Sequence, residues 1–349
     1  MRSGCGNALC PLKRQGSAAE EVAAMHKNHA YSSVFAELIK KYIRQRRDSG
    51  FLYDNPAYWL FRFDQFCVHG HVTVPIVTKE LFDAWSMKSP KESKTTQNNR
   101  LTALRCFCIH LSSIGIQCHI PHMLPKPEKH IPFLMGEEDI KAFFQEVDAY
   151  ECRSEVIYFK RLAWEYKVLF TLIFCCGLRI SEACDLLFHH VDTLHGTITI
   201  LHSKGDKDRI VYLENDLNKM CMNYKQRLVD ELCHVPRWLF PGRHSEEHIL
   251  KTSVDRKFNE IWNRTGKSRE STKKPTVHSL RHGFVIRRMD SWMENDVDFQ
   301  VMMPYLSQHL GHASPKDTYY YFHQVKETFK TIRRKDRTAN AVIPEVNHG

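Results

Sequence analysis

The chain has 349 residues, 42% of them hydrophobic and 26% charged, which is enough for two domains with separate cores. No apolar run approaches the ~20 residues of a membrane span, and the N-terminus lacks the apolar core of a signal peptide, so we expect a cytoplasmic protein without membrane contact. The formal net charge of +10 favours a polyanionic partner such as nucleic acid. The basic residues cluster at 267–274, at Arg287-Arg288 and at 330–337.

The N-terminal third predicts a tail and a small helical domain. Residues 1–30 have no strong periodicity and read as a flexible tail, and the helical domain covers residues 31–122. Its second helix opens with Asn55 as N-cap and Pro56 at the first helical position. Amphipathic patterns predict four helices, at about 34–43, 55–66, 78–87 and 93–114.

A Pro-rich stretch follows, "PHMLPKPEKHIP", with prolines at 121, 125, 127 and 132. Because proline cannot extend a helix and stiffens an extended chain, residues 123–133 are interpreted as a linker between domains.

The remaining residues, 134–349, predict a second domain that is again mostly helical. "GTITILHSKGDKDRIVYL" alternates apolar residues around Gly205-Asp206, which is a β-hairpin pattern. The fold class is therefore mainly α with a small β-hairpin or sheet, a helical N-domain preceding a mixed α/β domain. Helices are expected at about 137–149, 158–176, 214–233, 251–265 and 279–293, and within the last 45 residues.

Twelve cysteines are more than average for this length. Many lie in apolar helical patterns, where a free thiol packs as a small hydrophobe. The group Cys106, Cys108, His110, Cys118 and His119 lacks the paired Cys-x-x-Cys spacing of zinc sites. We therefore expect no metal and no cofactor.

Two segments place ionic side chains at breaks in the predicted elements. "FCCGLRISEACDLLF" puts Arg179 between two helices, with Glu182 three residues later, and "HSKGDKDR" puts Lys204 and Lys207 around the hairpin turn. Taken singly, a surface arginine and a solvated charged turn are the more common interpretations.

Two further segments lie nearer the C-terminus. "KPTVHSLRHGF" places His278 and Arg281 at i and i+3 on one face of a helix start, where an anion is also favoured. "LSQHLGHASPKDTYYYF" presents His312 just past a helix that ends at Gly311, with three consecutive tyrosines after it. Capping, loop and packing roles are open for each residue alone.

The order of these residues, Arg, Lys, His-x-x-Arg, His, Tyr, resembles the catalytic domain of the tyrosine recombinases, the phage-integrase family. "GLRISEACDL" resembles the first arginine box of the family, "HSLRHGF" its His-x-x-Arg box, and "LGHASPKDTYYYFH" its terminal box. The helical domain and the Pro-rich linker fit the core-binding domain of the family, so the resemblance covers roughly residues 31–330. The segment 282–311 is longer than the family pattern, and an insertion there is expected to extend a helix or loop and leave the site intact.

The resemblance also indicates which tyrosine is the nucleophile. In close relatives it comes nine residues after the histidine of the Leu-Gly-His element, which gives Tyr321 when counted from His312. On a helix, Tyr321 and Tyr319 border the apolar stripe and Tyr320 faces water. Tyr319 therefore remains the alternative.

The resemblance implies a site-specific recombinase or integrase of a mobile genetic element, which cleaves and rejoins double-stranded DNA through a 3′-phosphotyrosyl intermediate without metal. In this interpretation Lys204 protonates the leaving 5′-oxygen, with Lys207 as the alternative. His278 is an acid/base partner, His312 donates a hydrogen bond to the phosphate, and Glu182 orients the site. The catalytic set is Arg179, Lys204, His278, Arg281, His312 and Tyr321.

The resemblance also implies an oligomeric state, and other functions remain as alternatives. Each chain offers one nucleophile and recombination cuts four strands, so a homotetramer on paired DNA sites is predicted, with the two domains of each chain clamping the duplex. The tail after Tyr321 carries a short apolar segment, 341–344, that either docks on a neighbouring protomer or frays. The alternatives are a catalytically idle DNA-binding regulator on the same fold, a topoisomerase and a metal-dependent nuclease.

Overall fold

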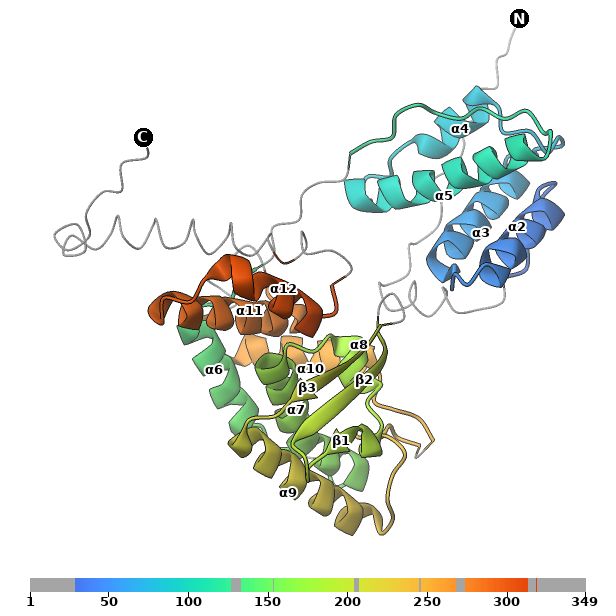
Figure 1. The fold of residues 1–349 in the computed structure, drawn as a ribbon. Helices are drawn as coiled ribbons and strands as arrows, with labels where there is room; N and C mark the ends of the chain where they lie inside the picture. The colour runs from blue at the N-terminus through green and yellow to red at the C-terminus, as the bar shows by residue number, and fades with distance from the viewer. Residues whose placement is uncertain are drawn as a thin grey trace, which may run out of the picture. The chain divides into compact units, whose positions relative to one another are not determined.

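The computed structural model describes residues 29–126, 133–152, 154–203, 207–244, 246–267, 274–312 and 318, and Figure 1 shows its ribbon. The chain divides into two compact units, Met1–His130 and Ile131–Gly349, and each is described by itself. The boundary falls in the Pro-rich stretch, whose function as a linker stays a prediction.

The first unit is helical, and its described part holds four helices in the order that the amphipathic patterns predicted. Their apolar faces meet in one core, in which Phe35, Leu60, Phe63 and Phe107 are fully buried. The helices are α2 (Ala36–Asp48), α3 (Asp54–His69), α4 (Lys79–Ser86) and α5 (Lys94–Ser113).

The predicted start of α3 is wrong by two residues: the first helical residue is Asp54, not Pro56. The residue before the helix is Tyr53, which has a left-handed φ of 55°, and not Asn55. The hydroxyl of Tyr53 donates to that of Tyr42 at 2.8 Å, and the two rings meet edge to face at 5.6 Å. This packing between helices sets the start of α3, whereas the sequence shows only the local capping preference.

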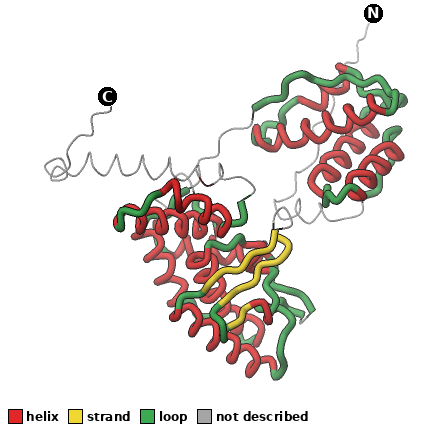
Figure 2. The backbone as a smooth tube through the Cα atoms, in the orientation of Figure 1, coloured by secondary structure: helices red, strands yellow, loops and turns green. Residues whose placement is uncertain are grey.

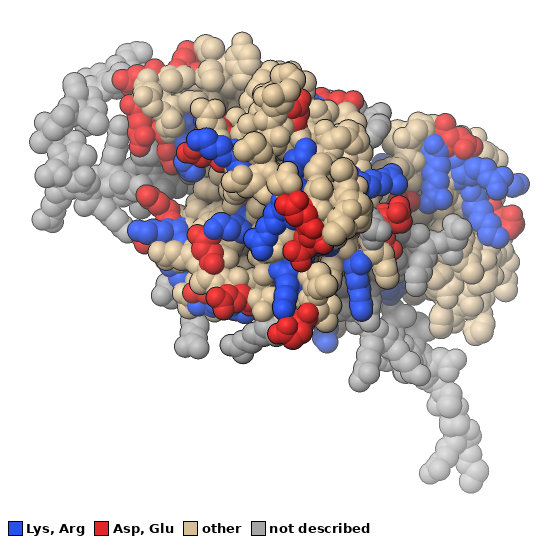
Figure 3. Space-filling model, turned by 90° about the horizontal axis from the view of Figure 1, so that it is seen from below, with Lys and Arg blue, Asp and Glu red and all other residues tan. Residues whose placement is uncertain are grey.

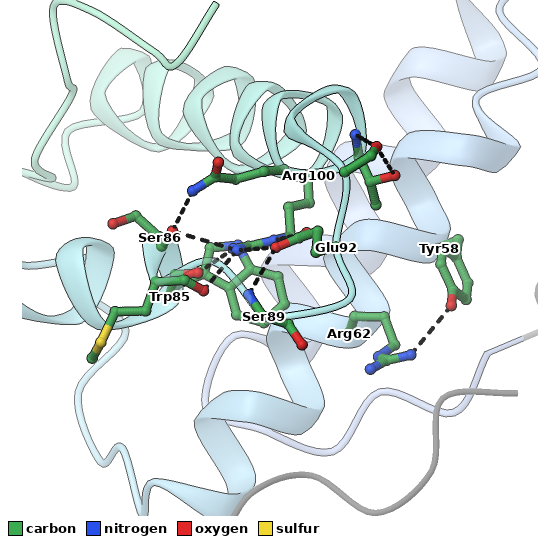
Figure 4. Close-up of polar contacts among 11 residues, drawn as sticks. Tyr58, Arg62, Trp85, Ser86, Ser89, Glu92 and Arg100 are labelled. Atoms are coloured by element: carbon green, nitrogen blue, oxygen red, sulfur yellow. Dashed lines mark hydrogen bonds and ion pairs between the residues drawn. The ribbon is translucent and has the colours of Figure 1, made fainter. Parts of the chain in front are cut away.

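The loop between α4 and α5 is fastened to the first unit by a buried arginine (Figure 4). Arg100 of α5 donates to both carboxylate oxygens of Glu92, at 2.6 and 2.9 Å, and also to the backbone carbonyl oxygens of Trp85 and Met87. The side chains of Arg100 and Glu92 are 7% and 6% exposed. Because an ion pair this deep is stable only when its polar atoms are satisfied, the loop and the helix hold each other in place.

The second unit is a helical body that carries one small sheet (Figure 2). Its core is continuous from α6 and α7 to α10, with Phe143, Phe170 and Phe258 fully buried and in mutual ring contact. Its elements are α6 (Glu137–Asp148), α7 (Ile157–Cys176), α8 (Ile180–Cys184), η1 (Phe188–His190), β1 (Val191–Asp192), β2 (Thr197–Ser203), β3 (Lys207–Tyr212), α9 (Asn215–Leu232), α10 (Lys251–Arg264), α11 (Val277–Glu294) and α12 (Phe299–His309).

The three strands run antiparallel in the order β1-β2-β3, and β2 and β3 form the predicted hairpin. Ile198 pairs with Val211, and both side chains are buried against the helices. Thr199 pairs with Ile210 on the opposite, outer face. The fold class, mainly helical with a small sheet, is confirmed, and β1 adds a short third strand to the hairpin.

The long segment 282–311 contains most of α11 and all of α12. The two helices pack on each other through a small core of their own, which includes Val285, Met289, Met303 and Leu306. The end of α12 lies beside the end of α7, where Nε2 of His309 is 3.0 Å from the carbonyl oxygen of Cys176. The insertion expected in this segment stays a prediction. None of the helices in the described ranges is long and apolar enough to cross a membrane.

Candidate active site

The site forms where α7 ends and α8 begins. Gly177 ends α7 with a φ of +63°, a conformation that suits glycine, and a Cβ at this position would lie 2.5 Å from the ring of Phe284. Arg179 then caps α8, and its backbone N–H donates to Glu182 Oε2 at 2.8 Å. The tight turn therefore fixes Arg179 and Glu182 next to each other.

Arg179 reaches two other parts of the site through its guanidinium. Its Nη1 donates to Glu182 Oε1 at 2.6 Å, and its Nη2 donates to the carbonyl oxygen of Gly311 at 2.8 Å. The Arg179 side chain is 18% exposed and that of Glu182 only 4%. The carboxylate is thus buried beneath an arginine that keeps some access to solvent.

Arg281 approaches the same carboxylate from α11. Its Nη1 lies 3.8 Å from Glu182 Oε2 and donates to the carbonyl oxygen of Gly177 at 2.6 Å, while its Nη2 donates to that of Leu310 at 2.7 Å. Its side chain is 1% exposed. The two arginines predicted from distant segments therefore meet around one carboxylate.

A third arginine completes this group, and the sequence interpretation did not include it. Arg209 of β3 donates from Nη1 and Nη2 to the two oxygens of Glu182, at 2.9 and 2.7 Å. A signal was present in the sequence, because period-two alternation puts Arg209 on the same face of the strand as Val211, which is buried. A charged residue on the buried face of a strand needs a partner, and here the partner is Glu182.

His278 lies near these arginines at the start of α11. The residue keeps an exposed surface, yet its partial burial, together with the charges of Arg281 and Arg179, lowers the pKa of its imidazole to about 4. Its ring meets that of His282 edge to face at 4.5 Å. At neutral pH His278 is therefore an uncharged imidazole that can accept a proton.

Two more histidines lie at the end of α12. His309 stacks on Phe284 and its Nε2 lies 3.0 Å from the carbonyl oxygen of Cys176, while Nδ1 of His312 lies 2.7 Å from the hydroxyl of Thr318. Burial lowers the pKa of His309, and the nearby arginines add to this shift. Both histidines line a groove of about 760 Å³ that Arg209 also borders.

The structure thus brings together Arg179, Glu182 and Arg281 and places His278 within reach of their charges, with His312 directly after Gly311. Lys204 and Tyr321, with the alternative Tyr319, lie outside the described residues. Lys207, the alternative to Lys204, is the first residue of β3. The catalytic roles of all these side chains stay predictions.

On the face drawn in Figure 3, Lys and Arg side chains are interspersed with Asp and Glu over much of the surface, and several Lys and Arg side chains lie together toward the right-hand end. Arg288, from one predicted basic cluster, lies 3.3 Å from Glu214. The runs 267–274 and 330–337 fall largely outside the described residues. Within the described part of the chain, no group of three or more His, Cys, Asp or Glu side chains is placed to hold a metal ion.

Comparison with known proteins points to one family. The model of the phage integrase family matches residues 135–328. A protein named "Putative integrase/recombinase y4rB" from Sinorhizobium fredii is 26% identical over 318 residues, which cover 88% of this chain and all of that protein. Tyrosine recombinase XerA from Pyrococcus furiosus is 26% identical over 216 residues, which cover 62% of this chain and 65% of the relative.

Solved structures show the same fold. The site-specific recombinase XerH, bound to difH substrate in a pre-cleavage complex, aligns with a TM-score of 0.61 and 18% identity, over 92% of this chain and 90% of XerH. The Tn1549 transposon integrase, in complex with a circular intermediate DNA, aligns with a TM-score of 0.60 and 17% identity, over 83% of this chain and 95% of that one.

Proposed function

Because the chain belongs to the phage integrase family, we propose that it is a tyrosine recombinase, which cleaves and rejoins DNA at specific sites through a 3′-phosphotyrosyl intermediate. The observation that carries the proposal is the cluster of Arg179, Arg209 and Arg281 around the buried Glu182. Three guanidinium cations against one carboxylate leave an excess of positive charge, which suits a phosphodiester.

The chemistry needs that charge. Attack on a phosphodiester produces a pentavalent phosphorus that carries a second negative charge, and preorganised cations stabilise it. The planar forks of Arg179 and Arg281 match phosphate oxygens and stay charged at any working pH. Since Arg281 is nearly buried, its contact with a phosphate requires the substrate to enter deeply beside Gly177 and Leu310.

The proposed nucleophile is Tyr321, which attacks in line as the bond from phosphorus to the 5′-oxygen breaks. The phenolic proton needs an acceptor, and His278 is a candidate because its imidazole is uncharged at neutral pH. Its low pKa makes it a weak base in the free protein, and a bound phosphate beside Arg179 and Arg281 should raise that pKa toward the working pH. Lys204, or Lys207 in its place, gives a proton to the leaving 5′-oxygen. His312 donates to the phosphate. A 5′-hydroxyl of another strand then reverses the reaction, and the phosphoester energy is kept throughout.

Double-stranded DNA with a specific site is the proposed partner. The XerH and Tn1549 integrase structures both contain DNA substrates, which supports it. A homotetramer on paired sites is proposed because each chain offers one nucleophile and four strands are cut. A mobile genetic element is the proposed carrier, which the name of the phage integrase family supports. A DNA-binding regulator without catalysis is the second candidate, and it predicts binding with no covalent product.

The test is a trapping experiment on candidate sites. The purified protein is incubated with a duplex that carries a nick beside the cleavage position, without divalent metal, and protein-linked DNA is resolved on a denaturing gel. Tyr321→Phe should abolish the adduct and keep DNA binding, because it removes only the nucleophilic oxygen, and Tyr320→Phe should change little. An adduct that persists in Tyr321→Phe and vanishes in Tyr319→Phe would move the nucleophile, and no adduct at all would favour the regulator.

A further inference from the structure

Arg209 differs from the two other arginines of the site in the hydrogen-bond partners of its guanidinium nitrogens. Nη1 and Nη2 each donate to a different oxygen of Glu182. Its Nε is buried and, among the described residues, has no hydrogen-bond partner. The side chain is 8% exposed, against 18% for Arg179. The Nη1 and Nη2 donors of Arg209 are therefore both directed at the carboxylate, although the residue also borders the groove beside His309 and His312.

We infer that Arg209 is a positioning residue for strand cleavage, which holds the Glu182 carboxylate and offsets its charge so that Arg179 and Arg281 keep their attraction for the DNA phosphate. The inference rests on the proposed function. Arg209 acts through Glu182 and does not touch the phosphate.

The distances from Glu182 to the two other arginines indicate how its carboxylate would act if Arg209 were absent. Its Oε1 lies 2.6 Å from Nη1 of Arg179, and its Oε2 lies 3.8 Å from Nη1 of Arg281. A carboxylate in this place competes with a phosphodiester for both cations, and burial strengthens its attraction. The bidentate contact from Arg209 supplies the compensating charge to both oxygens at once.

The surrounding backbone fixes Arg209 in this position. Residue 209 pairs with Ile200 in the β2–β3 ladder, so the sheet determines where the side chain starts. Gly311 lies against the other side, where a Cβ would be 3.2 Å from Nη1 of Arg209 and 3.4 Å from Nη1 of Arg179. The glycine therefore gives two like-charged guanidiniums room to approach one carboxylate.

The effect should fall on the chemical step. Loss of Arg209 reduces the cluster to two cations against one anion, and the phosphate needs the lost charge most when its own second charge develops. The measurement is the single-turnover rate of covalent adduct formation on a nicked site at saturating DNA, with the dissociation constant measured separately. We expect Arg209→Ala to slow the rate about 100-fold, as for loss of one preorganised donor, with little change in affinity.

The second variant separates this mechanism from a general loss of structure. Glu182→Gln combined with Arg209→Ala removes the carboxylate charge that competes for Arg179 and Arg281. This double variant should react about tenfold faster than Arg209→Ala alone, as expected for coupled neighbours. Arg209→Lys keeps the charge without the bidentate fork and should lie between wild type and Arg209→Ala. Arg264→Ala, which breaks an exposed Arg–Glu pair on α10, is the matched control and should react like wild type.

The inference would be overturned by an unchanged rate in Arg209→Ala, or by a double variant that is no faster than Arg209→Ala. It would also be overturned if a neutral methylphosphonate at the cleavage position rescued Arg209→Ala. That rescue would mean that Arg209 meets the phosphate charge directly. If Arg209→Ala does not fold, Arg209→Lys with and without Glu182→Gln makes the same comparison. Absence of an adduct from the wild-type protein would instead contradict the proposed function.

Discussion

Glu182 is the single residue on which the geometry of the site depends most. A buried carboxylate is costly unless charged partners and hydrogen bonds surround it, and this one has Arg179, Arg209 and the backbone N–H of residue 179. Those partners come from α8 and β3, and Arg281 of α11 lies within 3.8 Å. The arginines are therefore held in place by the protein itself before any DNA is bound.

The low pKa of His278 gives a prediction in the free protein. Titration followed by NMR of labelled histidine should show His278 uncharged from pH 8 down to well below its ordinary value of 6.5, with protonation near pH 4. A bound DNA phosphate places negative charge beside Arg179 and Arg281 and should raise this pKa. The signal is assigned with His278→Gln, and a midpoint near 6.5 without DNA would contradict the prediction.

The lowered pKa of His278 also determines how the stability of the folded protein changes with pH. The unfolded chain, with a pKa near 6.5, binds a proton that the folded protein binds only near pH 4. The stability that neutral His278 contributes is thus complete above pH 6.5 and is lost as the pH falls through about 4.

At the residue scale, the sequence predicted most of the cluster and missed one member. Arg179, Glu182 and Arg281 were predicted to share a site, and the structure brings both arginines within hydrogen-bonding or ion-pair distance of Glu182. Arg209 was missed because its partner lies 27 positions earlier, and a strand pattern shows that a side chain points inward but not what it meets. Tyr321 lies outside the described residues, so its assignment stays a prediction.

At the element scale, the turn from α7 to α8 has little tolerance for a larger residue, because an added Cβ at Gly177 would lie 2.5 Å from the ring of Phe284. Gly177→Ala should lower the free energy of unfolding by about 2–4 kcal/mol, because it adds the cost of a left-handed alanine to a clash with the ring of Phe284. Gly266→Ala is the matched control in the same unit, since Gly266 also has a positive φ of +77° but no atom within 4 Å of the added Cβ.

Chemical denaturation of both variants measures the difference. The control should lose only about 1 kcal/mol, the backbone cost alone. Equal losses in the two variants would show that Phe284 moves aside without penalty.

The loop between α4 and α5 supplies a prediction for the first unit. Arg100→Met should destabilise that unit by about 3–5 kcal/mol, because it leaves Glu92 as an unpaired buried charge. Combining it with Glu92→Leu should recover much of the loss, since the charge is then removed as well. Thermal unfolding followed by circular dichroism compares the variants, and Lys40→Met, at an exposed pair with Glu37, is the control.

The elements themselves were predictable to different degrees. The helices with a clear apolar stripe, such as α5 and α7, lie where the pattern placed them, and so does the hairpin. The pattern missed β1, which has two residues, and misplaced the cap of α3. A strand of two residues is too short to show a hydrophobic periodicity. A helix cap that is fixed by contacts between helices leaves no mark in the neighbouring sequence.

For the whole molecule, assembly is the property that remains to be tested. Deleting residues 338–349 should leave binding and cleavage of a single site intact and reduce the formation of paired-site complexes, because the apolar segment 341–344 would no longer dock on a neighbouring protomer. Native gels with one and two sites measure both properties. Full recombination by the truncated protein would show that the tail has no such role, and substitution of 345–349 alone serves as the control.

The helix ends beside the site have a consequence for the heat of DNA binding. Arg281 donates to the carbonyl oxygens of Gly177 and Leu310, and Arg179 to that of Gly311, all at the C-terminal ends of α7 and α12, where helical carbonyls lack partners within the helix. A phosphate that draws on the same guanidiniums takes hydrogen bonds from these helix ends. On DNA binding, the guanidiniums therefore exchange carbonyl oxygens for phosphate oxygens, and the number of hydrogen bonds changes little. The binding enthalpy should then be small for so polar an interface, and the C-terminal ends of α7 and α12 should become less ordered in the complex.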